Sequence, residues 1–217
     1  MQYPIFSSVV NSIDGSLTKR GISTRKFKTW EDNRINASGL EIAINLSKSS
    51  DFIRTLAINL DWDKFKEARL AKQLVGMENH PVLKELTEAE FEVPPIIDAE
   101  VSWLFDVNKC QPVLPGIKGN YRIENASRWM ESISKEMNSL LSDENLITRW
   151  HVEVDGDEKG RYLSAINLIT YFQYNMKGLS DLNEIKHFLN AQINTLLRKA
   201  NKVIFECDHI ITEVIAA

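Results

Sequence analysis

Apolar and polar residues alternate in several short segments of the chain, and a period of two is typical of half-buried β-strands. The first two such segments are separated by the turn-like residues 47–51, so we expect them to pair as a β-hairpin. Two further segments follow the same alternation later in the chain. The strands predicted from alternation lie at 40–46, 53–62, 101–107 and 150–155.

The segment 161–174 is less decisive, because two patterns overlap in it. Branched and aromatic residues are concentrated there, which favours a strand. Leu163, Ile166 and Ile169 also recur at a spacing of three, which is compatible with a helix. We expect a strand here and retain the helix as the alternative.

Helices are predicted where apolar residues recur every three or four positions. One such segment covers 125–141, and another begins near residue 63, with Asp61 or Asp63 as its N-cap. The longest covers 182–203 and is the most regular pattern in the chain. Its apolar stripe consists of Leu182, Ile185, Leu189, Ile193, Leu196, Ala200 and Val203.

These elements predict an α+β fold, with a mostly antiparallel sheet of about five strands and three or four helices that cover one of its faces. Residues 1–36 carry little pattern and are rich in Ser, Thr, Gly and charged residues. We therefore expect a basic N-terminal arm at 1–36, irregular or partly ordered, and a single α+β domain at 37–217. The apolar residues of the arm that precede the turn-like Asp14-Gly15 are compatible with a short docking helix; they are Ile5, Phe6, Val9, Val10 and Ile13. The length of 217 residues, with 43% hydrophobic and 26% charged residues, is ordinary for a soluble globular protein.

Charge is distributed unevenly along the chain, although the formal net charge is only −4. Between Asp14 and Glu31 there are five basic residues and no acidic one, which leaves the remainder of the chain at −9. Such a segment is complementary to an acidic protein surface, including that of a second copy of this chain. The residues expected to bind a partner are Lys19, Arg20, Arg25, Lys26, Phe27, Lys28 and Trp30.

The function favoured by this charge distribution is that of a non-catalytic binding or assembly subunit. It would dock on a protein partner or on itself through the basic arm, and the exposed part of the long C-terminal helix would extend the interface. A second alternative is single-stranded nucleic-acid binding, because the arm interleaves cations with aromatic rings. Five basic residues on an acidic protein are few for that purpose.

An enzyme is the other alternative, because several acidic residues fall on the polar sides of predicted strands. If these strands are neighbours, their carboxylates would suit Mg²⁺ or Mn²⁺, as in metal-dependent phosphodiesterases and nucleases. The metal-ligand candidates are Asp61, Glu100, His151, Glu153 and Asp155, and the catalytic candidates are Asp61, Asp63, Glu100, Glu153 and Asp155. Since the solvent face of an antiparallel sheet is polar in any case, we favour a protein without a cofactor.

Cysteine content and targeting signals bear on location. Cys110 and Cys207 lie far apart and belong to no zinc-binding spacing. The first ten residues lack the pattern of a secretory signal, and no apolar run is long enough to span a bilayer. A reducing, cytoplasmic location without membrane contact is therefore expected.

Overall fold

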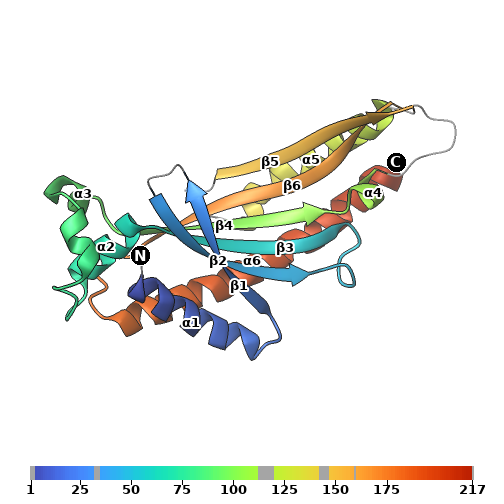
Figure 1. The fold of residues 1–217 in the computed structure, drawn as a ribbon. Coiled ribbons are helices and arrows are strands. Elements are labelled where there is room, and N and C mark those ends of the chain that lie inside the picture. Colours follow the sequence, from blue (N-terminus) through green and yellow to red (C-terminus); the bar gives the residue numbers. More distant parts are fainter. Residues whose placement is uncertain (1–2, 32–34, 112–119, 142–146, 159, 217) are drawn as a thin grey trace. The chain divides into compact units, whose positions relative to one another are not determined.

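The structure, a computed structural model, describes residues 3–31, 35–111, 120–141, 147–158 and 160–216. Within these ranges, the side chains of residues 27–31, 35–37, 85, 120–122 and 138 lie outside the description. The described residues form one antiparallel sheet of six strands together with helices (Figure 1). The predicted α+β class is confirmed, with six strands in place of about five.

The sheet has two edge strands from opposite ends of the sequence. Its strands are β1 (Ser23–Glu31), β2 (Ile35–Asn45), β3 (Ile53–Trp62), β4 (Ile96–Phe105), β5 (Ile147–Asp157) and β6 (Gly160–Asn175). Their order is β1-β2-β3-β4-β6-β5, so β1 and β5 end the sheet. The strand that the sequence pattern missed is β1, which lies in the segment expected to be irregular.

The helices match the predicted segments closely in most of the chain. They are α1 (Pro4–Thr18), α2 (Lys64–Gln73), α3 (Glu88–Glu92), α4 (Val107–Cys110), α5 (Asn120–Leu141) and α6 (Leu182–Ala216), with a 3-10 turn, η2 (Pro81–Glu85). Asp63 is the N-cap of α2, since its carboxylate accepts a hydrogen bond from Lys66 N at 2.8 Å. Helix α6 continues to Ala216, beyond the predicted end at 203, and every residue of its predicted stripe except Leu182 is buried.

The chain divides into two compact units. Unit 1 comprises Met1–Ala43, Ile58–Glu100 and Phe172–Thr195, and unit 2 comprises Ile44–Ala57, Val101–Tyr171 and Leu196–Ala217. Strands β2, β3, β4 and β6 and helix α6 contribute residues to both units.

In unit 1, residues 4–31 are not irregular, because α1 extends the short helix that the sequence allowed, β1 follows it, and α1 is part of the core. Helix α1 packs with six buried apolar residues, and Asn190 of α6 donates a hydrogen bond to Ser12 at 2.9 Å. Gly15, which resembled a turn residue, lies on the exposed side of the helix. The buried residues of α1 are Ile5, Phe6, Val9, Val10, Ile13 and Leu17.

In unit 2, helix α5 supplies a buried stripe of Trp129, Ile133, Met137 and Leu141. The ring of Trp129 lies 5.4 Å from that of Phe105 on β4 and 5.6 Å from that of Trp150 on β5. Sulfur and aromatic groups thus fill one side of the sheet in this unit.

The segment 161–174 is a strand, as expected, and a β-bulge explains its helix-like spacing. On β5, Glu153 and Val154 are consecutive, but their partners on β6 are Ala165 and Leu163. The extra residue, Ser164, is exposed. Because the bulge reverses the alternation, Leu163 and Ile166 are both buried although they are three positions apart.

Strand β5 differs from its prediction in burial. The pattern placed Trp150, Val152 and Val154 on a dry face, but Val152 is 40% exposed and Val154 is 44% exposed. Within the part of the chain that the structure describes, β5 pairs with β6 on one side and with no strand on the other, so its side chains have a neighbouring strand on one side alone. Trp150 is covered better, because its indole N–H donates to Ser134 Oγ on α5 at 2.8 Å.

Candidate functional site

The basic residues predicted to bind a partner are held by regular elements of unit 1. Lys19 is the C-cap residue of α1, where a positive charge interacts favourably with the helix dipole. Arg20 follows it and donates a hydrogen bond to the amide oxygen of Asn194 on α6. Both side chains are exposed.

The remaining basic residues belong to β1, where Arg25 and Lys26 are consecutive and point to opposite faces of the strand. Arg25 forms an ion pair with Glu41, its neighbour on β2, at 3.1 Å. Lys26 donates to the side chain of Asn11 on α1 at 2.9 Å. The backbone of Phe27, Lys28 and Trp30 pairs with β2, whereas their side chains lie outside the described residues.

Strand β1 offers a free backbone edge. It pairs with β2 along its whole length, from Ser23 opposite Ala43 to Glu31 opposite Ile35. Among the described residues, no strand pairs with its other side. An unpaired edge presents backbone N–H and C=O groups that can add a strand from another chain. This edge carries three basic residues and one acidic residue.

Strand β5, the edge strand of unit 2, has the opposite charge. It carries one basic residue and three acidic residues, Glu153, Asp155 and Asp157, all of them exposed. His151 Nε2 lies 3.6 Å from Glu153 Oε1, on the same face of the strand. The β5 edge therefore has the charge that a β1 edge would attract.

The residues predicted as a metal site or catalytic cluster are not gathered into one site. Among the described residues, no group of three His, Cys, Asp or Glu side chains is placed so that it could hold a metal ion. In unit 1, Asp61 is the penultimate residue of β3, Asp63 caps α2 and Glu100 lies half-buried on β4. His151, Glu153 and Asp155 lie on β5 in unit 2. The ligand set expected from the sequence is thus not assembled.

Unit 1 instead contains a buried carboxylate that the sequence analysis missed. Glu67 on α2 has no exposed surface, and its oxygens accept hydrogen bonds from Ile5 N, Phe6 N and Trp62 Nε1 at 2.8, 3.1 and 2.7 Å. It thereby caps the N-terminus of α1. The sequence signal was an acidic residue at the position of an apolar stripe, three and seven residues before Leu70 and Leu74.

A buried histidine lies beside this carboxylate. His80 Nε2 is 3.3 Å from Glu67 Oε1, and His80 Nδ1 accepts a hydrogen bond from Val82 N. Burial raises the pKa of Glu67, and the opposing contributions come from the hydrogen bonds of Ile5, Phe6 and Trp62 and from the charge of His80. This arrangement joins α1, α2 and η2, which is a structural role.

Both cysteines are free thiols buried in unit 2. Burial raises the pKa of Cys110 and of Cys207, with nearby carboxylates acting in the same direction. A thiol that stays protonated is a poor nucleophile and a poor metal ligand. The cysteines therefore act as small core residues.

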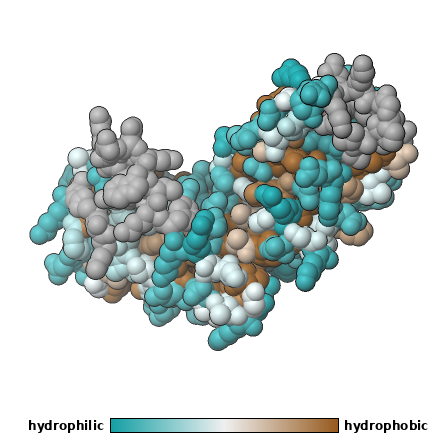
Figure 2. Space-filling model, turned by 45° about the vertical axis from the view of Figure 1, so that its right-hand side comes forward, coloured by the Kyte–Doolittle hydropathy of each residue, from teal (hydrophilic) through white to brown (hydrophobic). Residues whose placement is uncertain are grey.

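Hydrophobic atoms also reach the surface of the molecule (Figure 2). In unit 2, Phe205 on α6 is 71% exposed and Ile147 at the start of β5 is 67% exposed. Large exposed aromatic side chains are frequent anchors of protein interfaces. Phe205 lies in the part of α6 beyond the stripe that the sequence predicted.

Comparison of the chain with protein-family models, with curated proteins and with solved structures finds no match. Among the helices of the described residues, none combines the length and the apolar character that crossing a bilayer requires.

Proposed function

We propose that this protein is a non-catalytic assembly subunit that docks on an acidic protein surface through the basic edge strand β1. The observation that carries the proposal is the combination of a free backbone edge and an excess of positive charge on one strand. The backbone edge supplies hydrogen bonds to an added strand, and the charges select an acidic partner.

A second copy of the chain is the partner that the charges favour. Outside residues 15–30, the chain has an excess of nine acidic residues, and three of the acidic residues lie on the exposed edge strand β5. The exposed surface of α6 around Phe205 is proposed as a further contact. A reducing cytoplasm would suit the two buried free thiols.

Charge reversal on β1 tests this function without removing the core. Truncation of residues 1–30 would delete the buried face of α1, whereas Arg25 and Lys26 are exposed. We expect the wild-type chain to sediment as an oligomer at about 50 mM salt and to dissociate at about 500 mM, because screening weakens charge pairs. The double variant Arg25→Glu/Lys26→Glu should remain monomeric at both salt concentrations.

The matched control is the double variant Lys48→Glu/Lys84→Glu, which changes the net charge equally at two exposed lysines away from β1. This variant should associate as the wild type does. A wild-type chain that is monomeric over the whole accessible concentration range would overturn the proposal. So would a β1 variant that associates with unchanged affinity.

A further inference from the structure

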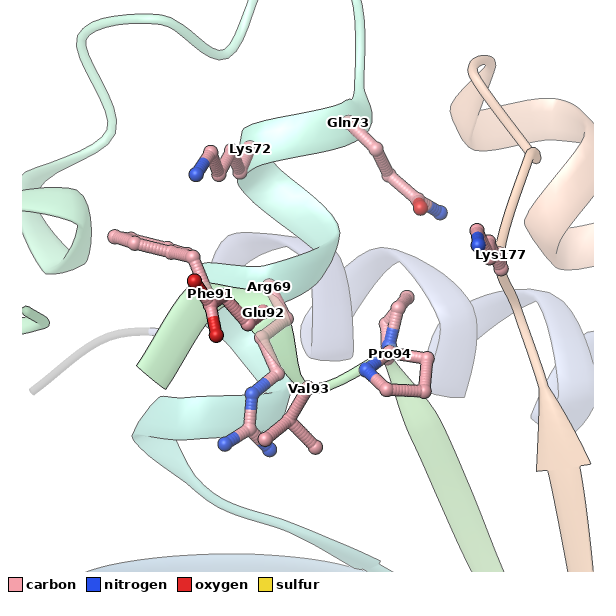
Figure 3. A pocket seen from close by; sticks show the side chains of 9 residues that line it. Arg69, Lys72, Gln73, Phe91, Glu92, Val93, Pro94 and Lys177 are labelled. Atoms are coloured by element: carbon pink, nitrogen blue, oxygen red, sulfur yellow. The ribbon is translucent and has the colours of Figure 1, made fainter. Parts of the chain in front are cut away.

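Unit 1 contains a pocket of about 300 Å³ that the proposed docking function does not use. Helix α2 forms one side of it, the segment from α3 to the start of β4 forms another, and Lys177, between β6 and α6, closes it (Figure 3). This volume lies at the lower end of the range of small-molecule sites.

Hydrogen bonds between the pocket's segments fix its walls. Gln73 of α2 donates from Nε2 to Met176 O at 2.7 Å, and Met176 N donates to Pro95 O at 2.9 Å. Val75 N donates to Ser180 O at 3.1 Å on the same side. Since Pro94 and Pro95 also restrict the backbone dihedral angles, the pocket is formed before any ligand binds.

The lining of the pocket combines apolar surface with positive charge. Phe91, Pro94 and Pro95 supply the apolar surface, together with Val93, which is 45% exposed. Three cationic side chains line the pocket, against one carboxylate, that of Glu92. Such an excess of cations contrasts with the acidic character of the whole chain.

The three cationic side chains differ in the contacts that they already make. Arg69 donates from Nε to Glu90 O at 2.9 Å, so its guanidinium is already engaged in part. Lys72 lies with its ammonium group 4.3 Å from the centroid of the Phe91 ring. Lys177 is exposed and has no carboxylate partner among the described residues.

Lys177 is also placed beside a second hydrogen-bond donor. Gln73 and Lys177 extend toward each other, whereas Lys72 extends toward Phe91 (Figure 3). The side-chain amide of Gln73 has two N–H bonds, of which the contact with Met176 O uses one. An ammonium and an amide N–H together suit a head group with a single negative charge.

We propose that this pocket binds a small monocarboxylate with an apolar body. The carboxylate is held by Lys177 and by the second N–H of Gln73, and the apolar body lies against Phe91, Val93 and the two prolines. Lys72 and Arg69 raise the positive potential around the head group. A phosphate dianion fits less well, because the described residues on the head-group side offer a single free ammonium, that of Lys177.

Titration calorimetry with octanoate tests the site, with octanamide, acetate and inorganic phosphate as comparison ligands. Octanoate should bind at one saturable site. Octanamide should bind at least about tenfold more weakly because it lacks the charge, and acetate and phosphate should bind more weakly still because they lack the apolar body. Equal affinity for octanoate and octanamide would contradict the proposed role of Lys177.

Two variants locate the binding. Lys177→Gln should reduce the affinity for octanoate at least about tenfold, and Lys48→Gln, at an exposed lysine of unit 2, should leave it unchanged. Octanoate binding that is equal in wild type and Lys177→Gln would place any site elsewhere and overturn the proposal. Because Lys177 is exposed, neither variant should alter folding.

Discussion

Each unit of the molecule uses one carboxylate on a helix to hold a segment that is distant in sequence, but the two carboxylates differ in burial. In unit 1, Glu67 has no exposed surface and accepts three hydrogen bonds from the start of α1 and from Trp62. In unit 2, Asp208 on α6 is half-buried and accepts from Ser50 Oγ, Asp51 N and Phe52 N at 2.8, 3.1 and 3.1 Å.

The comparison separates two ways in which hydrogen bonds stabilise a fold. The partners of Asp208 lie in the turn between β2 and β3, where Ser50 is buried but Asp51 is exposed and Phe52 is half-buried, so water can reach part of the turn when the acceptor is lost. The donors that face Glu67 are buried, so the loss of the acceptor leaves them without any partner. The three hydrogen bonds of Glu67 should therefore contribute more to the free energy of unfolding than the three hydrogen bonds of Asp208.

The largest effect is expected for Glu67→Ala. The substitution leaves the N–H groups of Ile5, Phe6 and Trp62 buried and unsatisfied, and it also leaves a cavity beside His80. We expect a loss of about 3–5 kcal/mol in the free energy of unfolding, measured by urea denaturation. The control Glu124→Ala, at an exposed glutamate of α5, should change it by less than about 0.5 kcal/mol. If Glu67→Ala lowered the free energy of unfolding no more than Glu124→Ala does, the contacts of Glu67 would not be needed for stability.

A smaller effect is expected for Asp208→Ala. Its three hydrogen bonds are charge-assisted, but solvent can reach the turn that they hold, so a loss of about 1.5–2.5 kcal/mol is expected. Asp51→Ala is the matched control, because the side chain of Asp51 is exposed in the same turn and only its backbone N–H contacts Asp208. If Asp208→Ala were as destabilising as Glu67→Ala, burial would not be the factor that separates the two carboxylates.

Local periodicity was sufficient to predict elements whose apolar stripe is regular. Helices α5 and α6 follow from such stripes, and the alternation in β3 and β4 follows from the residues that face one side of the sheet. In α1, serines, a glycine and an aspartate between the buried residues limited the prediction to a short helix, whereas the helix continues to Thr18. Strand β1 has no alternating apolar face, and its conformation depends on pairing with β2.

The buried carboxylate and the pocket depend on contacts between residues that are distant in sequence, and the spacing of apolar residues does not reveal such contacts. Glu67 meets Ile5 across 62 positions, and the pocket joins α2 to Lys177 across more than 100. The sequence did place Arg25 and Lys26 in a basic segment, but it did not indicate that they lie on a free sheet edge. The sequence placed most of the acidic candidates on the polar sides of strands, but it did not give the order of the strands in the sheet. In the described residues these side chains form no group that could hold a metal ion, and β6 separates β4 from β5.

The last prediction concerns pH and tests the burial of Glu67 directly. Because burial raises its pKa in the folded protein above the ordinary value of 4.5, the native state binds the proton more tightly than the unfolded chain does. The stability contributed by protonated Glu67 is therefore fully present below about pH 4.5 and is lost as the pH rises through the folded pKa. Each unit of pKa difference corresponds to about 1.4 kcal/mol.

Urea denaturation of the wild type and of Glu67→Gln over a pH series isolates this contribution, since glutamine does not titrate. The free energy of unfolding of the wild type, relative to that of the variant, should fall as the pH rises from about 4.5. Glu124→Gln, the same substitution at an exposed glutamate, is the control variant for the substitution itself. If the free energy of unfolding of the wild type, relative to that of Glu67→Gln, rose with pH, the donors at Ile5, Phe6 and Trp62, together with His80, would stabilise the carboxylate more than burial destabilises it. In that case the hydrogen bonds and His80, and not burial, would decide which protonation state of Glu67 the folded protein favours.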